Sequence, residues 1–369
     1  MASYLIGFAG VLSKSRDPVD IYLAGSTLRH RAAYLETATL IDPAGGVTAR
    51  VVPIPESVLE PVQRLLRVPR ASWLFGAYDV FHQLHLDADP AVPGRKLALT
   101  VHDTVMQEWP EDEGRPRAFT RDLIRRAAVV ITVSDYSRDS ILSTFGLPAE
   151  QVVVASNGVD HSRFYPRSPE EQLAVRDSLQ IEGPFALYMG GQTPRKNLPR
   201  AIAAFTLAAD QVGYPGQLVL AGPFAAIRAD VAAAVDAAHG KVRVIGYAPA
   251  ADVPALLAAA DLLLYPSLHE GFGLPVLEAM AAGTRVVTST QSALPEVAAG
   301  HAELADPSDV ESIAGAVVRV LLEDSAARSR VLAAGRAHAL SYTWERSAAA
   351  HVAAYHRIAA PDTGGESSL

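Results

Sequence analysis

Two glutamates, Glu270 and Glu278, lie eight positions apart in the stretch HEGFGLPVLEAMAAG, residues 269–283. The Gly-Phe-Gly turn between them lets backbone amides approach a ligand, and the proline and final glycine predict the first turn and the end of a helix. The N–H groups and dipole of such a helix N-terminus favour an anion such as a diphosphate. Both carboxylates can accept hydrogen bonds from hydroxyl groups. The stretch therefore predicts a ligand site, with a plain cap and a solvated helix residue as the structural alternative.

A second stretch that could bind phosphate is MGGQTPRKNLPRAI, which follows the expected strand FALYM and opens an expected helix. Arg195 presents a planar fork of N–H donors and Lys196 a compact positive charge, and both suit a phosphate. Ligands of parallel sheets bind beyond the carboxyl ends of the strands. This position therefore favours a phosphate site over ordinary surface basicity.

Polar residues also follow strands in the first half of the chain. LTVHDTV places His102 and Asp103 at a strand end, where the pair could contact a sugar or act on a proton, although a single histidine is more often structural. Ser134 in ITVSDYS and Asn157 in VVASNGVD occupy similar positions. Serine and asparagine are also common caps and turn formers, so these two are weaker candidates.

Several motifs that would indicate other chemistry are absent. The sequence has no G-x-x-x-x-G-K-[ST] loop, no G-x-G-x-x-G after a first strand, no H-E-x-x-H and no G-x-S-x-G. Nucleoside triphosphatase, zinc protease and serine hydrolase activities are therefore excluded. The chain has no cysteine, which fits a reducing cytoplasm, and its net charge of −8 gives no reason to expect nucleic acid as a partner.

The candidate residues need parallel sheets to bring them together. Short β-rich runs alternate with alanine- and leucine-rich helical patterns, which indicates parallel sheets with helices on both faces. The strand-like runs form two series: 21–25, 50–54, 78–82, 96–101, 128–133 and 152–156, then 185–190, 217–222, 242–246, 261–266, 285–289 and 302–306. A chain of 369 residues exceeds the size of one core, so we expect each series to form one doubly wound domain.

We place the domain boundary in the proline-containing segment FYPRS. The first domain is expected to cover residues 1–165 and to be completed by a helix at 342–358, the second to cover 166–341, and the tail 359–369 to be disordered. Two such domains facing each other would place the carboxyl ends of both sheets on a central cleft.

Taken together, these motifs resemble the retaining glycosyltransferases of the GT-B fold, in particular the mannosyltransferase-like members of family 4 (glycosyl transferases group 1). Glu270 and Glu278 look like the E-x7-E signature of that group, and Lys196 looks like its strand-loop lysine. Similar stretches also occur at VHD, VITVSDYS, SNGVD, SALPEV, DP and the final helix with Trp344, so the resemblance covers residues 97–358. It implies an α/β chain of the GT-B type, with two doubly wound Rossmann-like domains facing a central cleft.

The resemblance also implies a role for each matching residue. Arg195 and Lys196 would hold the diphosphate of a nucleotide-sugar donor, Glu270 would bind sugar hydroxyls, and Glu278 would bind the nucleotide ribose. His102 would lie over the reacting sugar with Asp103 beside it, so that His102, Asp103 and Glu270 are the catalytic candidates. The remaining donor-binding candidates are backbone or wall residues, namely Gly271, Phe272, Gly273, Leu274, Ser292, Ala293 and Leu294.

Cationic side chains and a helix N-terminus can stabilise a leaving diphosphate without a metal, and GT-B enzymes generally need none. We therefore expect no metal site and no cofactor, with the nucleotide-sugar as a substrate. Retention by same-face attack, with the leaving phosphate taking the acceptor proton, needs no protein nucleophile.

One feature departs from that family. Its members normally begin with a strand and a glycine-rich loop before the first helix, whereas this sequence begins inside a helical pattern at residues 2–13. We therefore expect the first domain to lack its usual first strand, and in-frame DNA upstream to encode that segment.

The expected function is transfer of a hexose from a nucleotide-sugar to a saccharide or lipid-linked acceptor, as in polysaccharide biosynthesis. GDP-mannose is the first expectation, with UDP-glucose and UDP-N-acetylglucosamine as other donors. The alternative is a catalytically weak GT-B protein that binds nucleotide-sugar or a partner enzyme. The arginine-rich stretch RPRAFTRDLIRRAA would allow weak peripheral association with the inner face of the membrane, although we favour a solvated helix face. The sequence leaves the oligomeric state open.

Overall fold

A computed structural model describes part of the chain with side chains, at residues 7–8, 10–12, 70, 72–73, 76–84, 86, 91–104 and 120–359, and the backbone alone at 21–25, 47–51 and 117–119. The predicted disordered tail falls outside the described residues beyond Ala359. The chain divides into two compact units. The first unit comprises Met1–Gly158 and Thr343–Leu369, and the second unit comprises Val159–Tyr342.

The second unit contains a six-stranded parallel sheet in the order β12-β11-β10-β7-β8-β9. Its strands are β7 (Phe185–Met189), β8 (Gln217–Ala221), β9 (Val242–Gly246), β10 (Leu262–Tyr265), β11 (Arg285–Ser289) and β12 (Glu303–Ala305). The chain builds one half of the sheet outward from β7 and the other half outward from β10 on the opposite side. In open sheets of this kind, ligands bind where the strand order reverses, which here is between β7 and β10.

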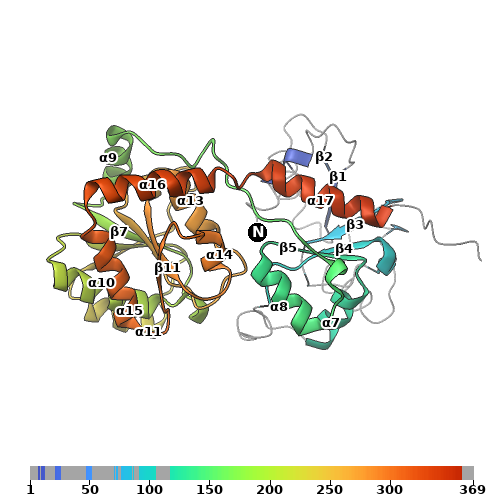
Figure 1. The fold of residues 1–369 in the computed structure, drawn as a ribbon, viewed down its shortest axis with the longest axis horizontal. Coiled ribbons are helices and arrows are strands. Elements are labelled where there is room, and N and C mark those ends of the chain that lie inside the picture. The colour runs from blue at the N-terminus through green and yellow to red at the C-terminus, as the bar shows by residue number, and fades with distance from the viewer. Residues whose placement is uncertain are drawn as a thin grey trace, which may run out of the picture. The chain divides into compact units, whose positions relative to one another are not determined.

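Helices cover both faces of this sheet (Figure 1). One group packs on the core that contains Phe205 and Val317, and it consists of α10 (Leu198–Val212), α11 (Ala229–Ala237) and α15 (Val310–Leu321). The other group comprises helices in mutual contact, namely α9 (Pro169–Ser178), α12 (Val253–Ala259), α13 (Leu274–Ala282) and α16 (Ser325–Ala339), and the short α14 (Leu294–Ala298) contacts α13. Because both faces are covered, β7 and β10 consist of buried or nearly buried apolar residues and one tyrosine each.

The first unit contains a four-stranded parallel sheet in the order β3-β4-β5-β6 and a two-stranded parallel pair, β1-β2. The strands are β1 (Ile21–Gly25), β2 (Val47–Val51), β3 (Phe81–Gln83), β4 (Leu97–Thr100), β5 (Val129–Thr132) and β6 (Val152–Val154). Helices α7 (Arg117–Arg126) and α8 (Asp135–Phe145) pack on one face of the larger sheet. The final helix, α17 (Trp344–Ala359), packs on the other face through Ala354, next to Ala98 and Ile131.

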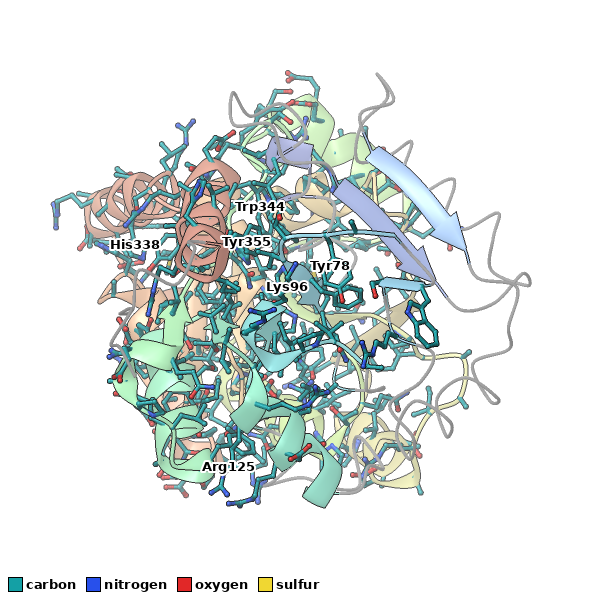
Figure 2. The ribbon with its side chains drawn as sticks, turned by 90° about the vertical axis from the view of Figure 1, so that its right-hand side faces the viewer. Tyr78, Lys96, Arg125, His338, Trp344 and Tyr355 are labelled. Carbon is teal, nitrogen blue, oxygen red and sulfur yellow. The ribbon has the colours of Figure 1, made fainter. Side chains whose placement is uncertain are left out.

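Polar contacts also hold α17 to the first unit. The hydroxyl group of Tyr355 lies 2.7 Å from Nδ1 of His82, and Nε2 of the same ring lies 2.7 Å from Oγ1 of Thr100. Burial holds the pKa of His82 well below its ordinary value, and the neighbouring His351 and His102 add to this shift. Elsewhere in the first unit, Lys96 donates to the backbone oxygen of Tyr78 at 2.7 Å. Figure 2 labels Tyr355, Lys96 and Tyr78.

Several expected boundaries differ from the observed ones. The strand expected at 50–54 is β2 at Val47–Val51, and the one expected at 78–82 is β3 at Phe81–Gln83. The units divide after Gly158 and after Tyr342, whereas the sequence placed the boundary after residue 165. The backbone N–H of Val159 donates to the Tyr342 oxygen at 3.1 Å and Arg163 donates to the Ala250 oxygen at 2.7 Å, so this segment packs on the second unit.

Candidate functional site

The loop after β7 places two cations at the carboxyl end of that strand. It forms a single 3-10 turn, Pro194–Lys196, and then reverses at Asn197, whose φ of 60° lies in the left-handed region. The Asn197 side chain fixes the turn because its amide donates to the backbone oxygens of Pro266 at 2.9 Å and Pro307 at 2.7 Å. Lys196 and Arg195 are thereby held beside the segment that follows β10.

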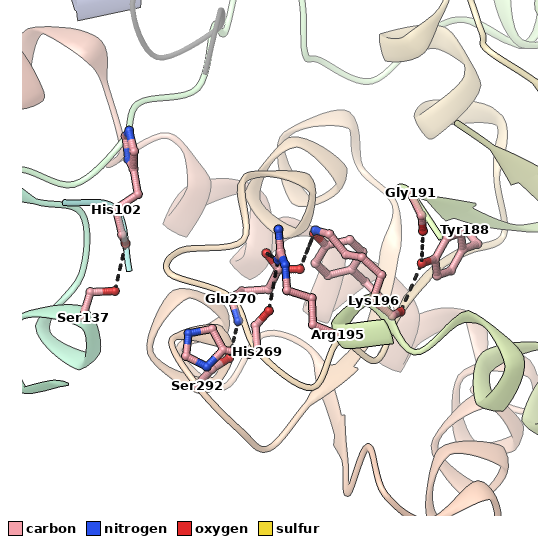
Figure 3. Close-up of polar contacts among 10 residues, drawn as sticks. His102, Ser137, Tyr188, Gly191, Arg195, Lys196, His269, Glu270 and Ser292 are labelled. Atoms are coloured by element: carbon pink, nitrogen blue, oxygen red, sulfur yellow. Dashed lines mark hydrogen bonds and ion pairs between the residues drawn. The ribbon is translucent and has the colours of Figure 1, made fainter. Parts of the chain in front are cut away.

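Lys196 and Glu270 form the centre of the site, together with Tyr265, the last residue of β10. Lys196 Nζ lies 2.6 Å from Glu270 Oε1 and 2.6 Å from the Tyr265 hydroxyl group, and that hydroxyl lies 2.8 Å from the same carboxylate oxygen. The Lys196 and Glu270 side chains are 15% and 10% exposed, so the ion pair is largely buried. Figure 3 shows Lys196 and Glu270 joined across the two loops.

Arg195 adds a longer contact to the same carboxylate. Its Nη1 lies 3.4 Å from Glu270 Oε2 and 3.3 Å from the backbone oxygen of His269 (Figure 3). Burial alone would raise the pKa of Glu270, but the charges of Lys196 and Arg195 outweigh burial and hold that pKa below its ordinary value. Glu270 is therefore ionised at neutral pH, and two cations facing one carboxylate leave a net positive charge.

The glycine turn after Glu270 leads into α13 as expected. Gly273 caps the helix with a φ of 105°, and a Cβ at this position would lie 2.6 Å from Cδ2 of Leu294. This position therefore requires glycine on two grounds, backbone conformation and space. Phe272 is buried, with its ring edge-on to Tyr342 at 5.9 Å. Leu274 begins the helix, which Gly283 ends in the left-handed conformation.

Glu278 lies in α13 and has surroundings unlike those of Glu270. Desolvation raises its pKa to about 7, although the charge of Arg163 acts in the opposite direction. Its carboxylate makes no hydrogen bond or ion pair with the part of the chain that the structure describes. Glu278 is only partly buried, but a partly desolvated carboxylate without such partners still destabilises the protein unless a ligand supplies donors.

The loop after β11 supports the Glu270 segment rather than presenting a free side chain. Ser292 Oγ accepts a hydrogen bond from the backbone N–H of Glu270 at 3.1 Å, and the N–H of Ala293 donates to the Glu270 oxygen at 3.3 Å. Leu294 is fully buried against Gly273. The structure thus brings together the predicted donor-binding residues of the second unit, Arg195, Lys196, Glu270 to Leu274 and Ser292 to Leu294, with Glu278 one helical turn further along α13.

The candidates of the first unit follow β4, β5 and β6. Ser137 donates from Oγ to the backbone oxygen of His102 at 3.1 Å (Figure 3). Ser134 caps α8 by accepting from the Ser137 N–H. Asp103 is partly buried beside His102. Asn157 is 6% exposed, and its Oδ1 finds no partner among the described residues. Ser134 has a structural role, whereas the catalytic roles of His102 and Asp103 stay predictions.

Sequence reasoning did not select Tyr265, Tyr188 or Arg163. Tyr188, in β7, donates from its hydroxyl to the backbone oxygens of Gly191 at 3.2 Å and Lys196 at 3.1 Å, and so fixes the backbone that carries the cations. Tyr265 and Tyr188 lie in apolar runs that predict buried strands of the core. In the sequence, the feature that could have identified them is a hydroxyl-bearing residue at or near the end of each strand that precedes a loop of the site.

The basic stretch is described only in part. In α7, Arg125 donates to the backbone oxygen of Phe145 at 3.0 Å, and Arg126 donates to that of Val92 at 2.9 Å. These two side chains therefore stabilise the first unit itself. Across the described residues, no helix combines the length and the apolar character needed to span a membrane.

Comparison with known proteins gives concordant matches. Residues 171–338 match the family described as Glycosyl transferases group 1, and residues 1–163 match Glycosyltransferase Family 4. O-antigen chain mannosyltransferase B of Escherichia coli is 33% identical over 312 residues, which cover 81% of this chain and 80% of that protein. MMP alpha-(1->4)-mannosyltransferase of Mycolicibacterium hassiacum is 29% identical over 286 residues, which cover 72% of this chain and 66% of that protein.

Solved structures match over nearly the whole chain. Sucrose-phosphate synthase of Thermosynechococcus elongatus has a TM-score of 0.69 at 19% identity, covering 92% of this chain and 99% of that one. Anabaena HepE, solved in complex with UDP-glucose, also has a TM-score of 0.69, at 18% identity, covering 90% and 100%. Structural similarity at such low sequence identity shows the fold, which is the α/β GT-B fold. The match to the E. coli relative covers four-fifths of both chains, and this protein therefore belongs to the family 4 glycosyltransferases.

Proposed function

We propose that this glycosyltransferase is a retaining mannosyltransferase that uses GDP-mannose and a saccharide or lipid-linked acceptor. The names of the two relatives, both mannosyltransferases, support mannose as the transferred sugar. The observation on which the donor site rests is the pair of glutamates, Glu270 and Glu278, that follow β10 where the strand order reverses. Glu270 holds two cations in place, and Glu278 is a partly buried carboxylate that lacks hydrogen-bond donors within the described residues and whose pKa is raised by desolvation.

The charges of the site suit a diphosphate. Lys196, Arg195 and Glu270 sum to one positive charge, so a bound diphosphate meets net attraction in a largely buried environment. As the bond between the sugar C1 and the phosphate oxygen breaks, negative charge develops on that oxygen. Lys196, Arg195 and the N-terminus of α13 stabilise this charge, so we propose that no metal ion is required.

The proposed transfer retains the configuration at C1. The acceptor hydroxyl attacks C1 from the face that the diphosphate leaves, a new C1–O bond forms, and the proton of the acceptor passes to the leaving phosphate oxygen. No side chain of this protein becomes a covalent nucleophile. We also propose that His102 contacts the reacting sugar with Asp103 beside it, as the family resemblance implies.

We assign the nucleotide ribose to Glu278. Two ribose hydroxyls would donate to a carboxylate that otherwise has no donors within the described residues, which favours its ionised form and lowers its pKa from about 7. The same contact would anchor the nucleotide on α13 while its diphosphate reaches Lys196.

A donor screen tests this proposal. The protein is incubated with GDP-mannose, UDP-glucose or UDP-N-acetylglucosamine and a panel of mannosides and lipid-linked saccharides, with and without EDTA, and release of nucleoside diphosphate is measured. We expect acceptor-dependent release of GDP that EDTA does not reduce and that Glu270→Gln abolishes. Binding of GDP-mannose without turnover on any acceptor would instead support a catalytically weak binding protein, and loss of turnover with EDTA would refute metal independence.

A further inference from the structure

Tyr265 occupies a position that the proposed function does not yet use. It ends β10, is 1% exposed, and meets both charged members of the site with its hydroxyl group. The three atoms Lys196 Nζ, Tyr265 OH and Glu270 Oε1 form a closed triangle, with sides of 2.6, 2.6 and 2.8 Å. Lys196 Nζ also lies 5.0 Å from the centre of the Tyr265 ring.

The chemistry of the three groups fixes the direction of each hydrogen bond. A lysine ammonium group can only donate, so the Tyr265 oxygen accepts from Lys196. An ionised carboxylate can only accept, so the Tyr265 proton points to Glu270 Oε1. Burial, together with the negative charge of Glu270, raises the pKa of Tyr265 well above its ordinary value, which keeps this proton in place.

The triangle distinguishes the two oxygens of Glu270. Oε1 accepts from both Lys196 and Tyr265, whereas Oε2 has the longer contact of 3.4 Å to Arg195. A carboxylate oxygen with a long contact keeps lone pairs available for a ligand hydroxyl. Lys196 uses two of its three N–H bonds in the triangle, which leaves one for a phosphate oxygen.

We infer that Tyr265 is a positioning residue of the donor site: its hydroxyl holds Lys196 and Glu270 so that the third Lys196 N–H and Glu270 Oε2 face the nucleotide-sugar. Without this hydroxyl, Lys196 loses its second hydrogen bond, and Glu270 keeps only the longer contact of 3.4 Å between Oε2 and Arg195, so the pair can rotate. The part of this inference that concerns the donor rests on the proposed function, whereas the part that concerns Glu270 can be tested without any donor.

The chain offers a matched control in Tyr188. Like Tyr265, it is 1% exposed, and it lies close to the site in the neighbouring strand β7. Its hydroxyl donates only to neutral backbone oxygens, those of Gly191 and Lys196. Tyr188→Phe therefore removes the same oxygen atom from an equally buried ring without removing a hydrogen bond to a charged group.

The first measurement is the titration of Glu270 in the full-length protein without ligand, followed by NMR of ¹³C-labelled glutamate carboxyl groups, with Glu270→Gln identifying the signal. A hydrogen bond donated to a carboxylate favours its ionised form, so its loss raises the pKa. We expect Tyr265→Phe to raise the pKa of Glu270 by about one unit and Tyr188→Phe to raise it clearly less, because Tyr188 acts only through the backbone of the loop that carries the cations. No shift in Tyr265→Phe, or an equal shift in both variants, would overturn the inference.

Site-specific replacement of Tyr265 by 3-fluorotyrosine provides a second variant should the phenylalanine variant fail to fold. Fluorine makes the phenol a stronger hydrogen-bond donor, so this change is expected to lower the pKa of Glu270 rather than raise it. An unchanged or raised pKa would contradict the predicted direction of the hydrogen bond.

The second measurement concerns the donor. With GDP-mannose, Tyr265→Phe should lower kcat/KM about tenfold, mainly through KM, and move the acidic limb of the pH profile upward, whereas Tyr188→Phe should move that limb clearly less. If no donor is turned over but the Glu270 pKa shifts as expected, the proposed function fails and the positioning of Glu270 by Tyr265 stands. If transfer proceeds and the pKa does not shift, this inference fails and the proposed function stands.

Discussion

Glu278→Gln should make the second unit more stable while it weakens donor binding. The free protein holds this carboxyl in a desolvated environment that raises its pKa to about 7 from an ordinary value of 4.5. Between these two values the native state binds more protons than the unfolded state, so stability falls as the pH rises through this window. A difference of about 2.5 units, at 1.36 kcal/mol per unit, corresponds to about 3 kcal/mol. Glutamine does not ionise and avoids this loss.

The free energy of unfolding of the second unit is the quantity to measure. The three tryptophans, Trp73, Trp109 and Trp344, all belong to the first unit, so tryptophan fluorescence does not report on the second unit. Hydrogen exchange of β10 and α13 peptides, analysed by mass spectrometry between pH 5 and pH 8, gives this free energy locally. We expect the advantage of Glu278→Gln over the wild type to grow by about 2.5 kcal/mol across this range.

The exposed Glu182 supplies a control, since Glu182→Gln should change stability little at any pH in this range. In the same Glu278→Gln variant, the affinity for GDP, measured by calorimetry at pH 7.5, should fall about tenfold because the ribose loses a charged acceptor. A stability difference that stays constant with pH would refute the desolvation argument. Unchanged GDP affinity would refute the ribose assignment.

The other predictions separate the site from the scaffold. Lys196→Ala leaves Glu270 buried without its nearest cation, so it should destabilise the second unit by about 3 kcal/mol in denaturant titrations and also weaken GDP binding. Lys196→Arg should keep most of the stability of the wild type. Full stability in the alanine variant would contradict the buried ion pair. Gly273→Ala should destabilise the second unit by about 1–3 kcal/mol and weaken GDP binding, because the added Cβ would lie 2.6 Å from Leu294. The control is Gly240→Ala, where φ is also positive but no atom lies within 4 Å of the added Cβ, and it should leave GDP binding intact. Glu323→Gln removes the negative charge that pairs with the buried Arg285, 2.8 Å away, and should destabilise the second unit by about 2 kcal/mol with unchanged GDP affinity; altered affinity would show that this pair reaches the site.

Much of the site could be predicted from the sequence because its residues lie in loops directly after strands. The apolar runs before Arg195, Glu270 and Ser292 indicated parallel strands, and parallel strands bring the loops at their carboxyl ends together. Contacts between these loops need the strand order, which the sequence does not state. The adjacency of β7 and β10 is what joins Lys196 to Glu270.

Other features depend on packing that no local pattern reveals. Tyr265 and Tyr188 read as core residues, and only the geometry of their hydroxyl groups relates them to the cations. The raised pKa of Glu278 results from desolvation by surrounding elements, whereas the sequence alone allowed an exposed helix residue. The division after Gly158 depends on backbone and side-chain contacts of the following segment, which outweigh the local signal of the prolines at 166 and 169.

The most direct test of the account is NMR analysis of the product formed from GDP-mannose, whose sugar is α-linked. The purified enzyme is incubated with GDP-mannose and a mannoside acceptor, and the anomeric configuration of the new linkage is read from the one-bond carbon–proton coupling at C1. We expect the wild-type protein to form an α-linked mannosyl product and Glu270→Gln to form none. A β-linked product would contradict retention, and transfer from UDP-glucose with none from GDP-mannose would contradict the proposed donor.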